Sequence, residues 1–441
     1  MKIAGNNILI QSLINEGVEY IFGYPGGAAL HIYDAIFNQK EMQHILVRHE
    51  QGATHAADGY ARATGKTGVV LVTSGPGATN AITGIATAFM DSIPMVIISG
   101  QVQSHLIGTD AFQETDMIGV SRPIVKHSFT VDKQENIANI VAEAFHIATS
   151  GRQGPVLIDV PKDLTNPDDL FDFVYPDKVH VRSYNPPTKP ENHQVSRAVD
   201  AILASERPVI YAGGGTISSN ASKELKELND LIDAPVTNTL MGLGVFPGTH
   251  KRFLGMLGMH GTYQANMAMH NADLIIALGA RFDDRITNAP DKFAPRAKVI
   301  HFDVDHSSVS KIIEADIAVF GQIKDSLQAI NNHLRTKIDE IDKEKLAPWH
   351  QQISDWKEKH GLNHDLYKTE DDSAPILPQA AIQHIYQESQ GKAFVTSDVG
   401  QHQMFAAQYY HFDKPRKWIN SGGLGTMGFG LPSAVGVKLA Y

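Results

Sequence analysis

The sequence contains no cysteine, and this absence excludes disulfides, thiolate catalysis and cysteine-ligated metals. It has no apolar run of the ~18–20 residues that a membrane-spanning helix needs. Its first residues lack the apolar core of a signal peptide. Positive charge is not in excess either, because 38 Lys and Arg stand against 48 Asp and Glu. We therefore expect a soluble cytoplasmic protein that binds neither nucleic acid nor membrane.

Glycine and short apolar runs are abundant, with 37 glycines among 441 residues. The apolar runs alternate with helical patterns and end at Gly or Pro, which is typical of parallel βαβ units. The sequence predicts an α/β protein of three doubly wound parallel-sheet domains, with the third incomplete because an ordinary domain needs about a hundred residues more. We expect these domains at residues 1–165, 190–335 and 373–441.

Glu50 is the most informative single residue. It opens a helical pattern directly after a short apolar run, residues 45–47. Ligands of parallel α/β sheets bind at the carboxyl ends of the strands, so a glutamate at this point is a candidate for chemistry. Taken alone, the more ordinary interpretation is an acidic residue that complements the positive end of a helix.

Two glycine-rich turns, residues 24–28 and 74–80, also follow an apolar run and precede a helical pattern. Such turns expose main-chain N–H groups that can hold an anion or a polar ligand. Each one alone is more simply a tight strand-to-helix turn. Together with Glu50, however, they are predicted to meet at the carboxyl edge of one sheet.

The second domain carries weaker signals. The three glycines at 213–215 are not a complete dinucleotide-binding fingerprint. The charged stretch 281–285 is either a surface ion-pair cluster or the frame of a ligand site. Asp303 and Asp305 end an apolar run, where a carboxylate can accept ribose hydroxyls. The 21 histidines form no recognisable metal-binding motif, and we predict no metal ligand.

Taken together, these segments resemble the thiamine-diphosphate enzymes and, within them, the catalytic large subunits of the acetolactate synthases. The resemblance covers the whole chain in the family's order. The matching segments are residues 23–28, 48–53, 73–77, 110–114, 150–152, 161–163, 258–261, 281–285, 399–404 and 422–427.

The resemblance implies an acetolactate synthase, a transferase of branched-chain amino-acid (isoleucine and valine) biosynthesis. Such an enzyme decarboxylates pyruvate on thiamine diphosphate and transfers the hydroxyethyl unit to pyruvate or 2-ketobutyrate. It also implies bound FAD without net redox use, a homodimer or homotetramer, and a small regulatory subunit. Glu50, Gln113 and Lys162 match the family's catalytic residues.

The resemblance assigns the remaining site residues as follows. Thiamine diphosphate would contact Glu50, Pro25, Gly26, Ser74, Asn80, Val399, Gly400, Gln401, His402 and Met427. FAD would contact Arg152, Gly213, Gly214, His260, Gly261, Thr262, Gly279, Ala280, Arg281, Asp303, Asp305 and Gln322. The substrate would contact Gly27, Phe112, Met259 and Arg285. The family's Mg²⁺ ligands would lie beyond Tyr441, in a C-terminal segment that this sequence lacks, which puts the activity of these 441 residues in doubt.

Two alternatives stay open at this point. One is another enzyme of the same fold, such as a pyruvate oxidase, a pyruvate decarboxylase or a carboligase. The stretches 281–285 and 400–404 favour the synthase, and Glu50 argues against the carboligase, which lacks this glutamate. The other is an inactive FAD-binding remnant, suggested by the incomplete third domain.

Overall fold

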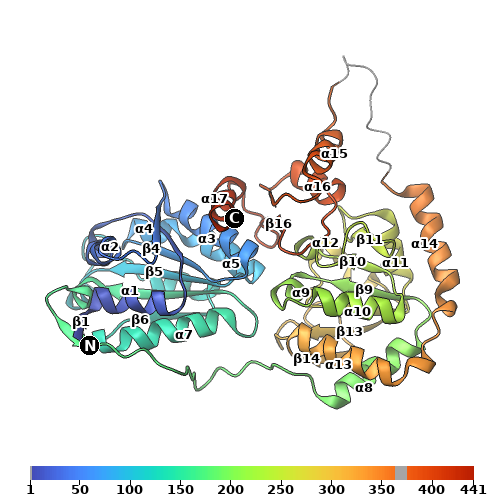
Figure 1. Ribbon diagram of the computed structural model, residues 1–441, viewed down its shortest axis with the longest axis horizontal. Helices are drawn as coiled ribbons and strands as arrows, with labels where there is room; N and C mark the ends of the chain where they lie inside the picture. The colour runs from blue at the N-terminus through green and yellow to red at the C-terminus, as the bar shows by residue number, and fades with distance from the viewer. Residues whose placement is uncertain (1, 363–374) are drawn as a thin grey trace. The chain divides into compact units, whose positions relative to one another are not determined.

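The computed structural model describes residues 2–362 and 375–441 (Figure 1). The chain forms two compact units. The first contains the chain up to Asn185 together with Ser421–Tyr441, and the second contains Pro186–Asn420. The predicted start of the third domain, residue 373, lies outside the described residues. In the part of the chain that the structure describes, no helix is both long and apolar enough to cross a membrane.

The first unit is built on a six-stranded parallel sheet of order β3-β2-β4-β5-β7-β6. Its strands are β2 (Tyr20–Gly23), β3 (Gln43–Leu46), β4 (Gly68–Val72), β5 (Met95–Gln101), β6 (His127–Thr130) and β7 (Pro155–Pro161). Its helices are α1 (Gly5–Asn15), α2 (Leu30–Phe37), α3 (Glu50–Thr64), α4 (Pro76–Asn80), α5 (Ile82–Asp91), α6 (Met117–Ser121), α7 (Ile137–Thr149) and α17 (Gly430–Ala440). A short antiparallel pair, β1 (Lys2–Ala4) and β8 (Leu170–Asp172), completes it.

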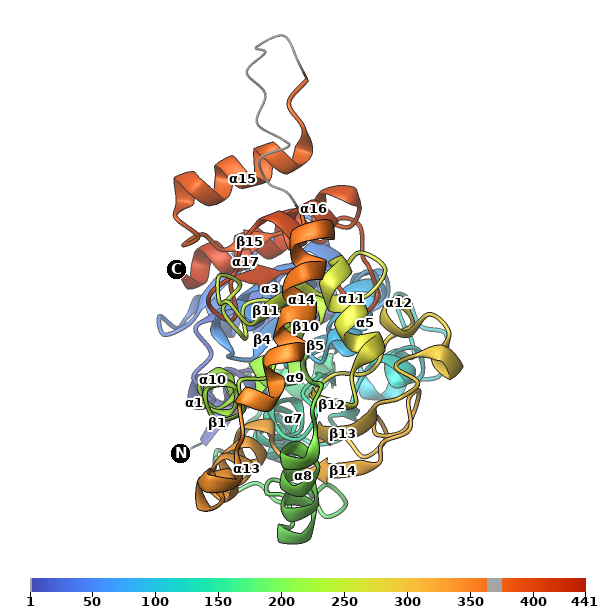
Figure 2. The ribbon, with the colours of Figure 1, turned by 90° about the vertical axis from the view of Figure 1, so that its right-hand side faces the viewer.

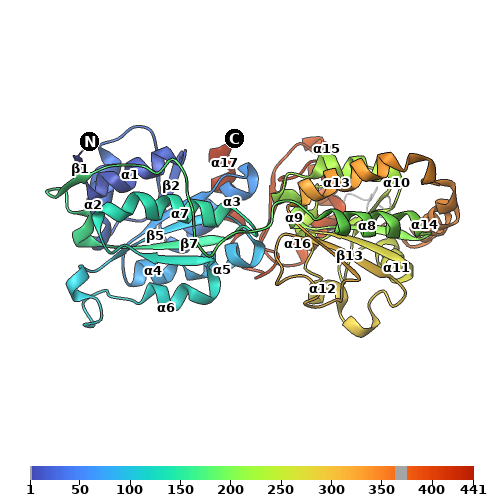
Figure 3. The same cartoon turned by 90° about the horizontal axis from the view of Figure 1, so that it is seen from below.

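Helices cover both faces of this sheet because successive strand residues point to opposite sides. Val69 and Leu71 of β4 pack in the core formed with α1, α2 and α7. Val70 and Val72 pack in the core formed with α3 and α5. Figure 3 shows the two helical layers on either side of the strands. The predicted doubly wound α/β fold is therefore confirmed for this unit.

The last helix, α17, packs closely against α3. A Cβ atom on Gly59 of α3 would lie 2.3 Å from the carbonyl oxygen of Ser433. A Cβ atom on Gly436 of α17 would lie 1.9 Å from the carbonyl oxygen of Ala56. Only glycine lets the two helix backbones approach so closely at these points. This contact fixes α17 to the helix that begins with Glu50.

The second unit is built on a parallel sheet of order β11-β10-β9-β12-β13-β14. Its strands are β9 (Pro208–Ala212), β10 (Val236–Asn238), β11 (Phe253–Met256), β12 (Leu274–Leu278), β13 (Lys298–Asp303) and β14 (Ile317–Phe320). Helices α8 (Asn192–Ala204), α10 (Ser222–Ile232) and α13 (Ile323–Thr336) cover one face. Helices α11 (Tyr263–Asn271) and α14 (Ala347–His360) cover the other, and Figure 2 shows α14 beside α11.

A smaller cluster in the second unit contains β15 (Val395–Thr396), β16 (Trp418–Ile419), α15 (Pro378–Ser389) and α16 (Gln401–Tyr409). The two strands pair in parallel, and an aromatic core around Tyr410, Phe412 and Trp418 holds the cluster together. The short helices α9 (Gly214–Ser218) and α12 (Asp284–Thr287) lie in turns that follow β9 and β12.

Candidate active site

The sheet topology of the first unit indicates where a ligand would bind. From β2 the chain passes to β3 on one side and later to β4 on the other side, so the strand order reverses between β2 and β4. Ligands of open α/β sheets bind outside the carboxyl ends of the strands at such a switch point. The predicted turns 24–28 and 74–80 follow these two strands.

Glu50 lies at this edge as the first residue of α3. His49 caps the helix, since its Nδ1 accepts a hydrogen bond of 3.1 Å from the main-chain N–H of Gln51. Only 7% of Glu50 is exposed. Its Oε2 accepts a hydrogen bond of 3.0 Å from Nδ2 of Asn80, at the end of α4. An acidic residue that only complements the positive end of a helix needs neither this burial nor the hydrogen bond from an amide. These two features therefore favour a chemical role for Glu50.

The glycines of the two turns form a cradle beside this carboxylate. A Cβ atom on Gly26 would lie 2.4 Å from Cγ2 of Thr73. A Cβ atom on Gly77 would lie 2.6 Å from the same methyl group and 3.2 Å from Oε1 of Glu50. The hydroxyl of Thr73 also accepts a hydrogen bond of 3.3 Å from the N–H of Ala28. The structure thus brings together Glu50 and the two glycine turns.

Two residues at this edge did not stand out in the sequence. Thr73 lies in a matching motif, but nothing marked its side chain as the contact between the turns. Tyr33 of α2 has a buried hydroxyl without a hydrogen-bond partner among the described residues. Burial, and then the charge of Glu50, raise the pKa of Tyr33 above its usual value. Both contacts depend on tertiary packing that local patterns do not encode.

Phe112, predicted to contact the substrate, and the predicted catalytic residues Gln113 and Lys162 lie on two loops at the same edge. Gln113 has a left-handed backbone with φ of +61°, and Phe112 leaves 88% of its surface exposed. A Cβ atom on Gly75 would lie 2.7 Å from the carbonyl oxygen of Gln113, so this loop lies against the turn after β4. Lys162 is half-buried and begins the 3₁₀ turn that follows β7.

A buried polar pair lies behind these loops. Nε2 of Gln101, the last residue of β5, donates hydrogen bonds to Oδ2 of Asp159 at 3.0 Å and to the carbonyl oxygen of Thr115 at 2.9 Å. Burial raises the pKa of Asp159 in β7 to about 7. Sequence reasoning missed this pair, which connects the ends of two strands to the loop that carries Gln113.

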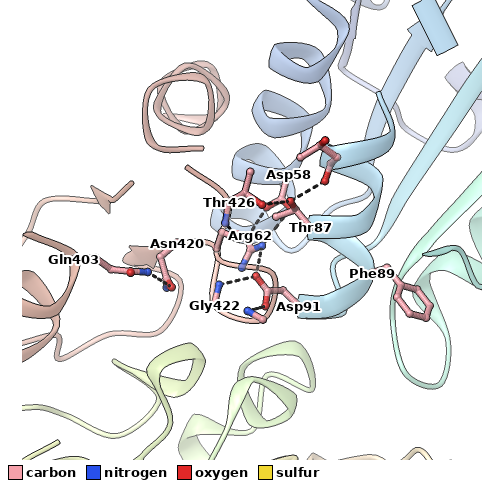
Figure 4. A network of polar contacts seen from close by, with 12 residues as sticks. Asp58, Arg62, Thr87, Phe89, Asp91, Gln403, Asn420, Gly422 and Thr426 are labelled. Atoms are coloured by element: carbon pink, nitrogen blue, oxygen red, sulfur yellow. Dashed lines mark hydrogen bonds and ion pairs between the residues drawn. The ribbon is translucent and has the colours of Figure 1, made fainter. Parts of the chain in front are cut away.

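The glycine-rich segment that carries Met427 is held by a buried charge network (Figure 4). The Asp91 carboxylate accepts hydrogen bonds from the N–H groups of Gly422 at 3.0 Å and Gly423 at 2.7 Å. Arg62 binds Asp91 at 2.9 Å and also Asp58, and no part of either aspartate side chain is exposed. Met427 itself leaves 77% of its surface exposed.

The second unit has a candidate ligand site of its own, at the carboxyl edge of its sheet. Its strand order reverses between β9 and β12; three glycines, 213–215, follow β9, and Gly279 follows β12. A Cβ atom on Gly213 would lie 2.2 Å from the carbonyl oxygen of Gly279, which has a φ of +55°. A Cβ atom on Gly215 would lie 2.8 Å from the Cα of Gly279. The two turns therefore meet backbone to backbone, an arrangement that suits the approach of a dinucleotide.

Acidic and amide side chains follow the neighbouring strands at this edge. Asp303 ends β13, and its Oδ1 accepts a hydrogen bond of 2.9 Å from the N–H of Asp305. The N–H of Gly321 donates to the carbonyl oxygen of Asp303 at 3.2 Å, which places the next residue, Gln322, beside it. Burial lowers the pKa of His301 in β13 to about 4, so this imidazole is neutral at physiological pH.

Met259 and Arg285, predicted to face the substrate, lie together in the second unit. The N–H of Met259 donates to the carbonyl oxygen of Arg285 at 2.9 Å, and the Arg285 Nη1 lies 3.8 Å from the Met259 sulfur. The intervening predicted FAD residue Thr262 caps α11 by accepting a hydrogen bond from the N–H of Ala265. Both Met259 and the Arg285 side chain are largely exposed.

Some predicted partners fall in different units. Arg152 lies in the first unit, where its Nε donates to the Ser92 hydroxyl at 2.8 Å and its guanidinium lies 5.8 Å from the Phe89 ring. The other predicted FAD residues lie in the second unit. Residues 399–402, predicted to contact the diphosphate, are also in the second unit, where they enter α16, while Glu50 is in the first.

Three family models match the chain. They are described as "Thiamine pyrophosphate enzyme, N-terminal TPP binding domain" at residues 3–120, the central domain at 195–330, and the C-terminal TPP binding domain at 398–441. Thiamine pyrophosphate is another name for thiamine diphosphate. The fold and the matches define a class, the thiamine-diphosphate enzymes, as the sequence predicted.

Curated relatives narrow this class. The chain is 56% identical to the acetolactate synthase large subunit of Buchnera aphidicola subsp. Schizaphis graminum, over 99% of this chain and 75% of that protein. It is 54% identical to the acetolactate synthase isozyme 3 large subunit of Escherichia coli, again over 99% and 75%. The Haemophilus influenzae large subunit is also 54% identical, over 100% and 76%. The chain therefore belongs to the acetolactate synthase large-subunit family. The other thiamine-diphosphate enzymes and the inactive remnant are not favoured.

Proposed function

We propose that this protein condenses pyruvate with a second 2-keto acid, pyruvate or 2-ketobutyrate, in branched-chain amino-acid biosynthesis. The observation that carries the proposal is Glu50, a buried carboxylate at the switch point of the first sheet, with Asn80 on one oxygen and a glycine cradle beside the other. When bound, thiamine diphosphate supplies the nucleophilic carbon that adds to the keto group and accepts the electrons released with carbon dioxide.

Glu50 holds and moves a proton at the edge of this cradle. Asn80 fixes Oε2, which leaves Oε1, on the side of Gly77, as the oxygen that would hold the proton shared with bound thiamine diphosphate. The methyl group of Thr73 lies against both glycines, and only 7% of Glu50 is exposed, so little water reaches the carboxylate. Electrostatic interactions are stronger where water is excluded. A proton shared between Glu50 and the cofactor would therefore strongly change the basicity of the cofactor group that accepts it.

The remaining residues bind and orient. Arg285 is an exposed guanidinium that can pair with a substrate carboxylate through two hydrogen bonds. The same proposal assigns five residues to the walls of the substrate channel: Gly27, Phe112, Gln113, Lys162 and Met259. Residues 399–402 would contact the diphosphate, and Met427 would support the cofactor from below the pyrimidine.

FAD belongs to the proposal as the ligand of the second unit. The lack of side chains at Gly213 and Gly279 would let a pyrophosphate approach the main chain, and Asp303 would accept ribose hydroxyls. We expect the purified protein to be yellow and to release flavin on denaturation. Replacing Asp303 with alanine should weaken flavin binding by about tenfold, the effect of one lost charge-assisted hydrogen bond. Flavin absorbance and equilibrium dialysis measure both effects, and a colourless folded protein that takes up no FAD would contradict the assignment.

Magnesium, subunits and location complete the proposal by resemblance. Mg²⁺ would hold the diphosphate in such an enzyme, and among the described residues there is no group of three or more His, Asp or Glu side chains that could hold a metal ion. The relatives are named large subunits, which supports a small regulatory partner. A homodimer or homotetramer and a cytoplasmic location remain proposals.

The direct test is turnover of pyruvate by the full-length protein. With thiamine diphosphate, Mg²⁺ and FAD present, we expect acetolactate to form, and 2-ketobutyrate to divert part of the product to acetohydroxybutyrate. Omission of thiamine diphosphate should abolish both products. Formation of acetaldehyde or of acetate and peroxide instead of acetolactate would favour a decarboxylase or an oxidase.

A further inference from the structure

The loop between β5 and α6 closes on one carboxylate, that of Glu114. Its Oε1 accepts a hydrogen bond from the main-chain N–H of Gly108, and its Oε2 accepts one of 2.9 Å from the N–H of Ala111. The main-chain N–H of Glu114 in turn donates to the carbonyl oxygen of Ala111 at 2.9 Å. The side chain thus ties both ends of this short turn to a single group.

The backbone of this loop needs such a tie. Gly108, Asp110 and Gln113 have φ values of +84°, +58° and +61°, in the left-handed region. This region is unfavourable for residues with a Cβ atom, so two of the three positions are held against their local preference. Phe112 leaves most of its surface exposed and cannot hold the loop through a hydrophobic core. The bonds to Glu114 are therefore a principal constraint on the loop.

The loop is also anchored where it meets the rest of the site. The carbonyl oxygen of Gln113 lies against Gly75 in the turn after β4. Beyond Glu114, the carbonyl oxygen of Thr115 accepts the hydrogen bond from Nε2 of Gln101. The segment between these anchors carries Phe112 and Gln113, and Glu114 determines its shape.

We propose that Glu114 is a positioning residue that holds Phe112 and Gln113 at the substrate edge of the first unit. Its carboxylate acts through the loop and does not itself touch the substrate. The part of the inference that concerns substrate rests on the proposed function. Hydrogen bonds from the N–H groups of Gly108 and Ala111 hold the pKa of Glu114 below its usual value, in keeping with a carboxylate that is bonded as the anion.

The experiment compares Glu114→Gln and Glu114→Asp with Glu135→Gln, an exposed glutamate in the 3₁₀ turn Gln134–Asn136. Glutamine keeps the shape but presents an amide NH₂ to one of the two N–H donors, whereas aspartate keeps the charge. Hydrogen exchange of residues 106–116 by mass spectrometry reports the loop, and KM and kcat for pyruvate report its role.

We expect Glu114→Gln to exchange about tenfold faster at Gly108 and Ala111, and to raise KM about fivefold with kcat within about twofold, because a charge-assisted bond is lost. Glu114→Asp should recover part of both effects, and Glu135→Gln should change neither. Unchanged exchange in Glu114→Gln would overturn the role of the carboxylate. Faster exchange with unchanged KM would overturn the positioning role and leave the proposed function intact. A wild-type protein that forms no acetolactate would instead contradict the proposed function, and the substrate role of the loop with it.

Discussion

Replacing Glu50 with glutamine should lower acetolactate formation by about 10²–10⁴-fold, the usual contribution of a positioned proton donor or acceptor. Glutamine has nearly the same shape and can still accept the hydrogen bond from Asn80. It cannot, however, hold or release a proton at Oε1, the oxygen beside Gly77. The loss should therefore appear in kcat, with the fold unchanged by circular dichroism. Product formation from pyruvate measures it directly.

A second readout separates proton transfer from substrate binding. Exchange of the thiazolium C2 proton of bound thiamine diphosphate for deuterium, followed by nuclear magnetic resonance, should slow in Glu50→Gln before any pyruvate is added. Asn80→Ala is the matched control, because it removes the bond to Oε2 and keeps the carboxylate. It should lose less than Glu50→Gln, about tenfold for one hydrogen bond to a charged group. An exchange rate in Glu50→Gln equal to that of the wild type would remove Glu50 from the mechanism.

The first site could be anticipated because its parts are local in sequence. Glu50 begins a helix in the structure as predicted, and the glycine turns follow β2 and β4. Parallel-sheet topology then brings the ends of these strands to one edge. The sequence could not reveal Tyr33, Thr73 or Asp159 as neighbours. Their roles arise from contacts between elements that lie far apart in the sequence, and the spacing of apolar residues does not predict such contacts.

Local sequence patterns also could not predict that the two parts of the last expected domain pack with different units. Residues 421–441 pack with the first unit, whereas residues 375–420 belong to the second. The sequence shows an apolar helix at α17, but the partner of that helix depends on complementary close contacts. Gly59 and Gly436 supply those contacts from positions that lie far apart in the chain.

Replacing Arg62 with methionine should destabilise the first unit by about 3–5 kcal/mol, because it leaves buried carboxylates without their cation. Asp58 and Asp91 have fully buried side chains, and Arg62 binds both. Methionine preserves much of the side-chain volume, so lost charge and not lost packing dominates. The measurement is unfolding in urea, detected as the urea concentration at which a protease begins to cleave residues 421–441, which belong to this unit.

The control is Lys66→Met, which breaks the ion pair between Lys66 and Glu19, where about half of each side chain is exposed. An exposed pair contributes about 0–1 kcal/mol, so this variant should resemble the wild type. The combined change Asp58→Asn, Arg62→Met, Asp91→Asn removes all three charges and should recover part of the loss. The amide that replaces the Asp91 carboxylate keeps one oxygen, which can still accept a bond from one glycine N–H.

The stability loss caused by Arg62→Met should depend on pH, and the pKa of Asp58 gives the direction of that dependence. Burial raises the pKa of Asp58, and Arg62 opposes that rise, so removing Arg62 should raise the pKa further. A carboxyl whose pKa is higher in the folded protein than in the unfolded chain destabilises the fold as pH rises above its unfolded value. The deficit of Arg62→Met should therefore be larger at neutral pH than in mildly acidic buffer. If Arg62→Met and Lys66→Met were equally stable at both, the buried network would not be what holds residues 421–441 to this unit.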